Sequence, residues 1–216
     1  MSDSSTPSKA LLALVSAPSG AGKTTLCDKL LNASSNITRA VTCTTRAPRG
    51  AEKNGVDYYF LSEQDFMKKV EAGEFLEHAT VYGRLYGTLL SEVLDKLNSG
   101  KDVLLNIDVQ GAATIRRKAE ETPEINKALV SVFLTPPSME ELERRLRSRG
   151  EDDEATIQTR LALARHEIEK WTEFDYLLVS ETVDPDTPSK DEDLRRMKCI
   201  MEAEKMRRER SLPPTN

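Results

Sequence analysis

The chain has 216 residues, of which 38% are hydrophobic and 31% are charged, and its formal net charge is −5. This length suffices for one sizeable α/β core. The acidic balance argues against a dedicated nucleic-acid or membrane surface, because either would need a basic field. No apolar stretch approaches the roughly 20 residues of a membrane span, and the first residues lack the features of a signal peptide. A cytoplasmic location is therefore expected.

The three cysteines are far apart and match neither a metal-binding spacing nor a disulfide framework. We expect Cys27, Cys43 and Cys199 to be reduced packing residues.

The first predicted elements are a strand over residues 10–15, a glycine-containing turn and a helix that ends near residue 32. They follow a polar stretch, 1–9, that is expected to form a loose tail. Glycines in the turn let backbone N–H groups point at a phosphate. Lys23 adds a positive charge, and the hydroxyl of Thr24 at the helix N-terminus can ligate Mg²⁺. The turn, A-P-S-G-A-G-K-T, departs from the usual G-x-x-x-x-G-K-[ST] at Ala17. It predicts a nucleoside triphosphate site formed by Ala17, Pro18, Ser19, Gly20, Ala21, Gly22, Lys23, Thr24 and Thr25.

The next block, about residues 35–88, has the pattern of a small β-rich insertion. Strands are expected at 40–45 and 58–61, separated by a segment rich in Arg, Pro and Gly. A helix should begin with a capping box at Ser62 and Asp65 and end near residue 73. Alternating polar and apolar positions over 74–82 predict a half-exposed strand, and a turn at 82–87 leads into another short strand.

The second half of the chain alternates strands and helices. Helices are expected at 89–97, 138–147, 155–174 and 192–210, and strands at 103–107, 128–134 and 176–180. Ser138 and Glu141 form a second capping box. This alternation predicts a parallel sheet flanked by crossover helices. Because ligands of such sheets bind beyond the carboxyl ends of the strands, the phosphate loop, residues 42–45 and residues 106–110 are expected to converge on one cleft.

Four residues are candidates for binding a second phosphate. Arg46 and Arg49 lie three apart in T-T-R-A-P-R, and Tyr58 and Tyr86 follow. Guanidinium forks and phenolic donors suit a phosphate group. From this segment alone, a solvated loop with its arginines facing water is an equal alternative.

Glu77 is a candidate for reading a base. If the strand turns it inward, its carboxylate can accept two hydrogen bonds from the edge of guanine, where adenine would place an acceptor. Thr42, Thr88 and Asp108 could add polar contacts. Considered without any family context, each of these residues is better explained as a surface polar residue.

Arginines are concentrated in two later segments. Arg145 and Arg149 share a helix face, with Arg160 on the next helix, and positive charge there suits phosphoryl transfer. Arg144 and Arg147 are expected on the solvated face of the same helix. The basic residues Lys205, Arg207, Arg208 and Arg210 are expected to lie on a solvated terminal helix.

Eight motifs in this order resemble those of guanylate kinases over about residues 11–180. They are S-A-P-S-G-A-G-K-T-T, T-T-R-A-P-R, N-G-V-D-Y-Y-F, G-E-F-L-E, Y-G-R-L-Y-G-T, N-I-D-V-Q-G-A, P-P-S-M-E-E-L-E-R-R-L and R-S-R-G-E-D-D-E-A-T-I. The resemblance implies a P-loop NTPase fold that transfers the γ-phosphoryl group of ATP to GMP with Mg²⁺. It also implies a single domain over 10–216, with a core of 10–34 and 89–216, a GMP-binding subdomain of 35–88 and a helical lid of about 138–160.

The resemblance also implies roles for individual residues. Lys23, Arg145, Arg149 and Arg160 would be catalytic, and Thr24 would meet the metal. The GMP site would comprise Thr42, Arg46, Arg49, Tyr58, Glu77, Tyr86, Thr88 and Asp108. ATP and GMP are the expected substrates, without nucleic acid or membrane; dGMP as a further acceptor, and a monomer or a homodimer, stay open.

Two departures from the family pattern bear on the site. Asn106 stands where the family commonly has Asp, which removes a charge near the expected metal. Ser180 stands where Asn is usual, and the loop after it looks lengthened. Two alternatives stay open: a non-catalytic guanylate-kinase-like module that binds peptides, and a related kinase acting on an acceptor such as ribose bisphosphate.

Overall fold

A five-stranded parallel sheet forms the centre of the computed structural model, which describes residues 10–148, 150, 152–180, 191–207 and 210. Its strand order is β2-β7-β1-β8-β9, and each neighbouring pair is parallel. The strands are β1 (Leu12–Ser16), β2 (Ile37–Arg39), β7 (Asp102–Asn106), β8 (Leu129–Thr135) and β9 (Tyr176–Val179). The predicted parallel sheet is confirmed. The short edge strand β2 was not expected, and it places part of the segment 35–88 in the central sheet.

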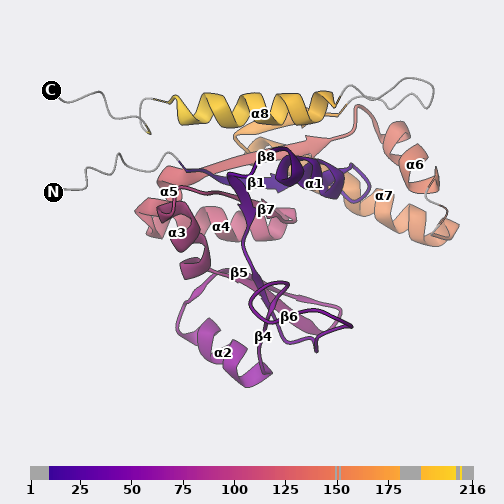
Figure 1. Cartoon of the computed structure of the whole chain (residues 1–216). Coiled ribbons are helices and arrows are strands. Elements are labelled where there is room, and N and C mark those ends of the chain that lie inside the picture. The colour runs from indigo at the N-terminus through magenta and orange to yellow at the C-terminus, as the bar shows by residue number, and fades with distance from the viewer. Residues whose placement is uncertain (1–9, 149, 151, 181–190, 208–209, 211–216) are drawn as a thin grey trace, which may run out of the picture.

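Strand β1 lies in the middle of this sheet, and all five of its residues are fully buried. Ala13 and Val15 face a core shared with α1 (Lys23–Ala33) and α8 (Glu192–Lys205). Leu12 and Leu14 face a second core shared with α3 (Leu90–Asn98), α4 (Val109–Glu121) and α5 (Pro123–Ala128). Helices therefore cover both faces of the sheet, as Figure 1 shows. Helices α4 and α5 had not been predicted.

The second sheet has the order β4-β3-β6-β5 and extends to one side of the central sheet (Figure 1). Its strands are β3 (Thr42–Thr44), β4 (Tyr59–Phe60), β5 (Phe75–Val81) and β6 (Arg84–Leu89). Helix α2 (Glu63–Glu71) packs against it through Phe66, whose ring stacks on Phe75 at 4.4 Å between centroids. The predicted cap is confirmed, because the hydroxyl of Ser62 accepts from the backbone N–H of Asp65 at 3.0 Å.

Helices α6 (Met139–Ser148) and α7 (Glu154–Ile168) pack on each other through a small core of their own. The helix predicted over 155–174 is wrong at its end: α7 stops at Ile168 and continues as a 3₁₀ turn, Glu169–Glu173. The tighter turn leads into Phe174, whose ring packs against Phe133 with 5.2 Å between centroids. Two residues therefore separate the 3₁₀ turn from β9, which begins at Tyr176.

The terminal helix differs from the predicted solvated helix. Helix α8 ends at Lys205, whose ammonium donates to the buried carboxylate of Asp102 at 2.6 Å. Asp102 also accepts from the backbone N–H of Leu11 at 2.9 Å. The guanidinium of Arg210 pairs with buried Glu204 at 3.0 Å. These cations therefore bind the helix to the sheet.

Arg207 also pairs with Glu204, at 3.3 Å, and Arg208 lies outside the described residues. Cys27 and Cys43 are buried, as expected, but Cys199 is exposed on the terminal helix. Within the described parts of the chain, no helix combines the length and apolar character that crossing a membrane would require.

Candidate active site

The loop between β1 and α1 has the backbone that the sequence predicted for it. Gly20 and Gly22 both have left-handed φ angles, +93° and +98°, and Gly22 caps α1. The left-handed region favours glycine because a side chain there is strained. A Cβ at Gly20 would also lie 2.8 Å from a methyl group of Leu146 on α6. Helix α6 is therefore packed directly against the phosphate loop.

Lys23 connects this loop to the end of β7. Its ammonium donates to the carbonyl of Ile107 at 2.7 Å. Burial lowers the pKa of Lys23, and the nearby Asp108 carboxylate opposes that effect. Asp108 itself caps α4 by accepting from the backbone N–H of Gly111 at 2.8 Å. The predicted convergence of the phosphate loop with residues 106–110 is confirmed.

The four residues predicted to read a base come together in the second sheet and at its border with the core. Thr88 pairs in register with Thr42 on one side and with Glu77 on the other. The Thr88 hydroxyl donates to Oε1 of Glu77 at 2.8 Å. Burial raises the pKa of Glu77, and the Asp108 carboxylate raises it further. The two carboxylates are therefore close enough to affect each other.

Three of the four candidates for a second phosphate also lie together. The Arg46 guanidinium sits 5.2 Å from the ring centroid of Tyr58, and Tyr58 meets Tyr86 edge-on at 6.3 Å. Nη2 of Arg46 donates to Oε1 of Glu52 at 2.9 Å, and this bond is the main reason that the pKa of Arg46 is raised. Arg49 joins through its backbone N–H, which donates to the other oxygen of Glu52 at 2.7 Å, while its residue as a whole is exposed.

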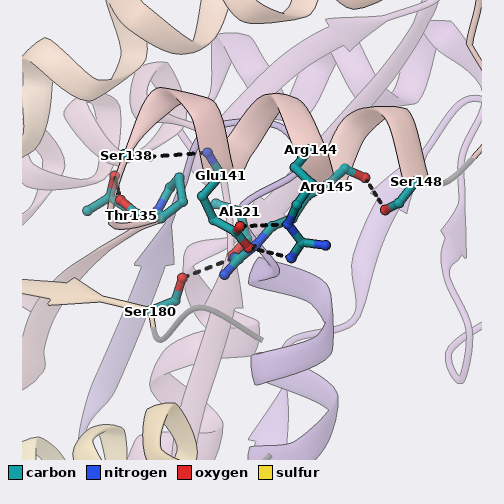
Figure 2. Close-up of polar contacts among 9 residues, drawn as sticks. Ala21, Thr135, Ser138, Glu141, Arg144, Arg145, Ser148 and Ser180 are labelled. Carbon is teal, nitrogen blue, oxygen red and sulfur yellow. Dashed lines mark hydrogen bonds and ion pairs between the residues drawn. The ribbon is translucent and has the colours of Figure 1, made fainter. Parts of the chain in front are cut away.

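Arg145 reaches from α6 to the phosphate loop. Its Nη1 donates to the carbonyl of Ala21 at 3.2 Å and to the hydroxyl of Ser180 at 3.0 Å, and its Nε donates to Oε1 of Glu141 at 2.7 Å. Figure 2 shows the guanidinium between these three groups. Ser180, which stands where the family pattern has Asn, is thus a partner of Arg145.

The other arginines of this region have different positions. Arg160 forms an ion pair with Asp152 at 2.9 Å, and Arg149 lies outside the described residues. Arg144 and Arg147 are about half exposed, in agreement with the solvated positions expected for them. Among the described arginines of α6 and α7, Arg145 is the one whose side chain is seen to bond the phosphate loop.

Sequence reasoning missed two carboxylates that lie at this candidate site, Glu52 and Glu167. Glu52 follows T-T-R-A-P-R, but nothing in its spacing marks it as the partner of Arg46. Glu167 lies near the phosphate loop: burial raises its pKa, and the Ser19 N–H and the Lys23 ammonium partly oppose that effect. Its Oε2 is buried and has no hydrogen-bond partner among the described residues. Its sequence context, a charged helix, carries no signal of this position.

A cavity of about 400 Å³ lies elsewhere, near Arg116, Ser131 and Asp175. Ser131 and Asp175 lie toward the amino ends of β8 and β9, and Arg116 lies on α4, whereas the phosphate loop follows the carboxyl end of β1. The candidate site is therefore defined by the convergence of its polar side chains and not by this cavity.

Comparison with known proteins gives consistent results over most of the chain. Residues 9–196 match the family model described as Guanylate kinase. The guanylate kinase of Cereibacter sphaeroides is 44% identical over 202 residues, which cover 94% of this chain and 90% of that protein. That of Coxiella burnetii is 48% identical over 176 residues, 82% of each chain. A crystal structure of guanylate kinase from Anaplasma phagocytophilum has a TM-score of 0.66 at 34% identity and covers 95% of this chain and 91% of that one. The matched residues include every candidate residue of the site.

Proposed function

The chain belongs to the guanylate kinase family, and on this premise we propose that the site transfers the γ-phosphoryl group of ATP to GMP, giving GDP and ADP. The observation that supports this most directly is the partly buried Glu77, with Thr88 bonded to it and Asp108 nearby, beside a phosphate loop. A buried carboxylate that meets the wrong base is left without its partners, and such mismatches discriminate strongly.

On the donor side, residues 17–25 would hold the phosphates of ATP. The left-handed glycines let N–H groups converge on the anion, and Lys23 contributes its charge. Among the described residues, no group of three or more His, Cys, Asp or Glu side chains could hold a metal ion. This arrangement fits Mg²⁺, which keeps several waters and takes substrate phosphate oxygens, with the Thr24 hydroxyl as one protein ligand. When bound, Mg²⁺ would neutralise charge on the phosphates.

On the acceptor side, Arg46, Arg49, Tyr58 and Tyr86 would bind the phosphate of GMP. A phosphate dianion offers more charge and more acceptor oxygens than Glu52, so it can replace this carboxylate as the partner of Arg46. Glu77, with Thr42, Thr88 and Asp108, would bind guanine. In this proposal the segment 35–88 is the GMP-binding subdomain.

The reaction then needs positioning and charge more than proton transfer. The acceptor phosphate is already an anion, so no general base is required. Lys23 and Arg145, assisted by Arg149 and Arg160, would stabilise the charge on the transferring group. Closure of the subdomain and of the lid, about 138–160, would exclude water and prevent hydrolysis of ATP. A cytoplasmic location belongs to the same proposal.

The test is ADP release from ATP and Mg²⁺ with GMP, AMP, CMP, UMP or ribose 1,5-bisphosphate as the acceptor. We expect turnover with GMP well above the others. Binding of GMP without turnover would instead favour a non-catalytic module, and turnover with the sugar phosphate would replace the proposed acceptor.

A further inference from the structure

Glu141 is a buried carboxylate that binds two arginines. Its side chain is 7% exposed. Oε1 accepts from Nε of Arg145 at 2.7 Å and from Nη2 of Arg144 at 2.8 Å, and Oε2 accepts from Nε of Arg144 at 2.8 Å. Figure 2 shows the carboxylate between α6 and the phosphate loop. One negative charge is therefore shared by two cations, one of them mostly buried.

The helix cap does not explain this placement. The sequence predicted that Glu141 would complete a capping box with Ser138, and half of that box is present: the backbone N–H of Glu141 donates to the Ser138 hydroxyl at 3.2 Å. The carboxylate itself bonds the two arginines. Hydrogen bonds from Arg144 and then Arg145 hold its pKa at about 2, against the effect of burial. Glu141 is therefore ionised at any pH at which an enzyme of this kind works.

Its partner Arg145 connects three separate parts of the fold. The guanidinium meets Glu141 on α6, the carbonyl of Ala21 in the phosphate loop and the hydroxyl of Ser180 after β9. A long side chain loses up to about 2 kcal/mol of rotamer entropy when it is ordered. Contacts made by the protein itself can offset that cost before substrate arrives. Arg145 is consequently held beside the loop that is proposed to bind ATP.

A second pair on the same helix shows what an ordinary surface ion pair looks like. Arg147 and Glu143 have the same i, i+4 spacing and meet at 2.7 Å, but their side chains are 43% and 39% exposed. Exposed pairs of this kind contribute at most about 1 kcal/mol. The Glu141–Arg145 pair differs in burial and in its connection to the phosphate loop.

We propose that Glu141 is a positioning residue for phosphoryl transfer, which fixes Arg145 over the phosphate loop so that its charge is in place for the transferring group. This inference rests on the proposed function. Preorganised charge costs little reorganisation at the moment of reaction, and that is where electrostatic catalysis gains most. Glu141 would act through Arg145 and would not touch the substrate.

A double-mutant cycle in kcat tests the proposal. The four proteins are wild type, Glu141→Gln, Arg145→Ala and the double variant, each assayed as a GMP kinase. We expect Glu141→Gln to lower kcat about tenfold, equivalent to about 1.4 kcal/mol, with the KM for GMP changed by less than about twofold. In the Arg145→Ala background the same substitution should lower kcat by less than about twofold, because the residue through which Glu141 acts is gone.

Glu143→Gln is the matched control, since it makes the same chemical change in the exposed pair of the same helix, and it should leave kcat unchanged. An equal loss from Glu141→Gln in both backgrounds, or no loss in the wild-type background, would overturn the proposal. Thermal unfolding of each variant reports on folding. If Glu141→Gln does not fold, the cycle is repeated with Glu141→Asp, which keeps the charge but shortens its reach, and the same coupling is required.

Failure of this inference can be distinguished from failure of the proposed function. A wild-type protein that does not phosphorylate GMP would contradict the function itself. An active wild type with full kcat in Arg145→Ala would contradict the role of Arg145, and Glu141 as its positioning residue with it. Loss in Arg145→Ala with none in Glu141→Gln would contradict this inference alone.

Discussion

Two arginine–carboxylate pairs belong to the candidate site, Arg46–Glu52 in the loop between β3 and β4 and Arg145–Glu141 on α6. Both arginines are largely buried, with side chains 11% and 15% exposed. Their carboxylates differ, because Glu52 is 25% exposed whereas Glu141 is 7% exposed. Glu52 belongs to the loop that precedes β4, and Glu141 lies in a helix that packs on the phosphate loop.

The difference indicates which carboxylate can leave. Glu52 is the more exposed of the two and lies in a loop, so under the proposed function a phosphate would replace it beside Arg46 and the neighbouring tyrosines. Glu141 has no comparable route, and breaking a buried pair by removing one partner leaves an uncompensated charge, a change that costs about 3–5 kcal/mol in known cases. An arginine–glutamate ion pair therefore suits two purposes. Glu52 is expected to be displaced from Arg46 by substrate, whereas Glu141 is expected to stay bound to Arg145.

Both pairs are expected to act in one reaction at the phosphate loop. Lys23→Ala tests whether that loop takes part in the reaction, and it should have the largest effect of the variants considered. Removing the ammonium should lower kcat by at least about 10³-fold, because its charge stabilises the transferring group. Steady-state ADP release measures this. Lys29→Ala, an exposed lysine of the same helix that pairs with Asp191, is the control and should stay near wild type. A near wild-type kcat for Lys23→Ala would remove the loop from the reaction.

Arg46→Ala should break the acceptor side alone. Loss of a charged partner for phosphate is expected to raise the KM for GMP about 50-fold, with the KM for ATP nearly unchanged. This outcome would contrast with the kcat effect expected for the Glu141–Arg145 pair on α6. Arg84→Ala, at an exposed position in the same sheet, serves as the control. If Arg46→Ala lowered kcat and left the KM for GMP unchanged, Arg46 would act on the transfer step, as is expected of Arg145, and not on acceptor binding.

Glu77→Gln sharpens the acceptor side further. The amide presents a donor where guanine needs an acceptor, so the KM for GMP should rise about tenfold and the preference over AMP should narrow. Burial and Asp108 raise the pKa of Glu77, so its charged form is lost at a higher pH than in an ordinary glutamate.

The wild-type KM for GMP should therefore begin to rise on acidification while ordinary glutamates are still ionised, and the Gln variant should lack this component. Identical pH profiles for the two proteins would exclude Glu77 from the base site. Unfolding measured over the same pH range separates binding from stability.

Glu52→Gln is expected to have the smallest effect. If Glu52 is displaced by substrate, its charge matters little once GMP is bound, and kcat and the KM for GMP should each change by less than about threefold. The same chemical change at Glu141 is expected to cost about tenfold in kcat. Equal losses at the two positions would erase the distinction between an exchangeable and a fixed pair.

The elements that could be predicted are those whose pattern is complete within a few adjacent residues. The apolar run before Ser16, the glycines after it and Lys23 define strand, loop and helix locally, and the structure follows them. Strand β2 has three residues and no alternation long enough to recognise. Helices α4 and α5 were also missed. The pattern of residues 106–110 predicted only a part of the site, although α4 begins at Val109.

The partners of charged residues were the main failure, since they depend on packing between distant segments. Glu141 and Arg145 are four residues apart on one helix, a spacing visible in the sequence, but nothing in the sequence indicated that this pair would be buried beside the phosphate loop. Lys205 and Asp102 lie 103 positions apart. No local pattern distinguishes such a cation from one in water.

The phosphate loop follows β1 and Asp108 follows the neighbouring strand β7, so the parallel sheet brings them to one edge. Glu52 and Glu167, the carboxylates that were missed, come from a loop and a helix.

The junction of Leu11, Asp102 and Lys205 has a consequence for synthesis on the ribosome. Asp102 receives the backbone N–H of Leu11, 91 positions earlier, and the ammonium of Lys205, 103 positions later. Strand β1 also lies between β7 and β8, which are both made much later. The first strand to leave the exit tunnel must therefore wait, apolar and without neighbours, until most of the chain has followed. Chains dominated by such distant pairings fold slowly and expose aggregation-prone surface meanwhile, so this nascent chain is a natural client for chaperones that bind early.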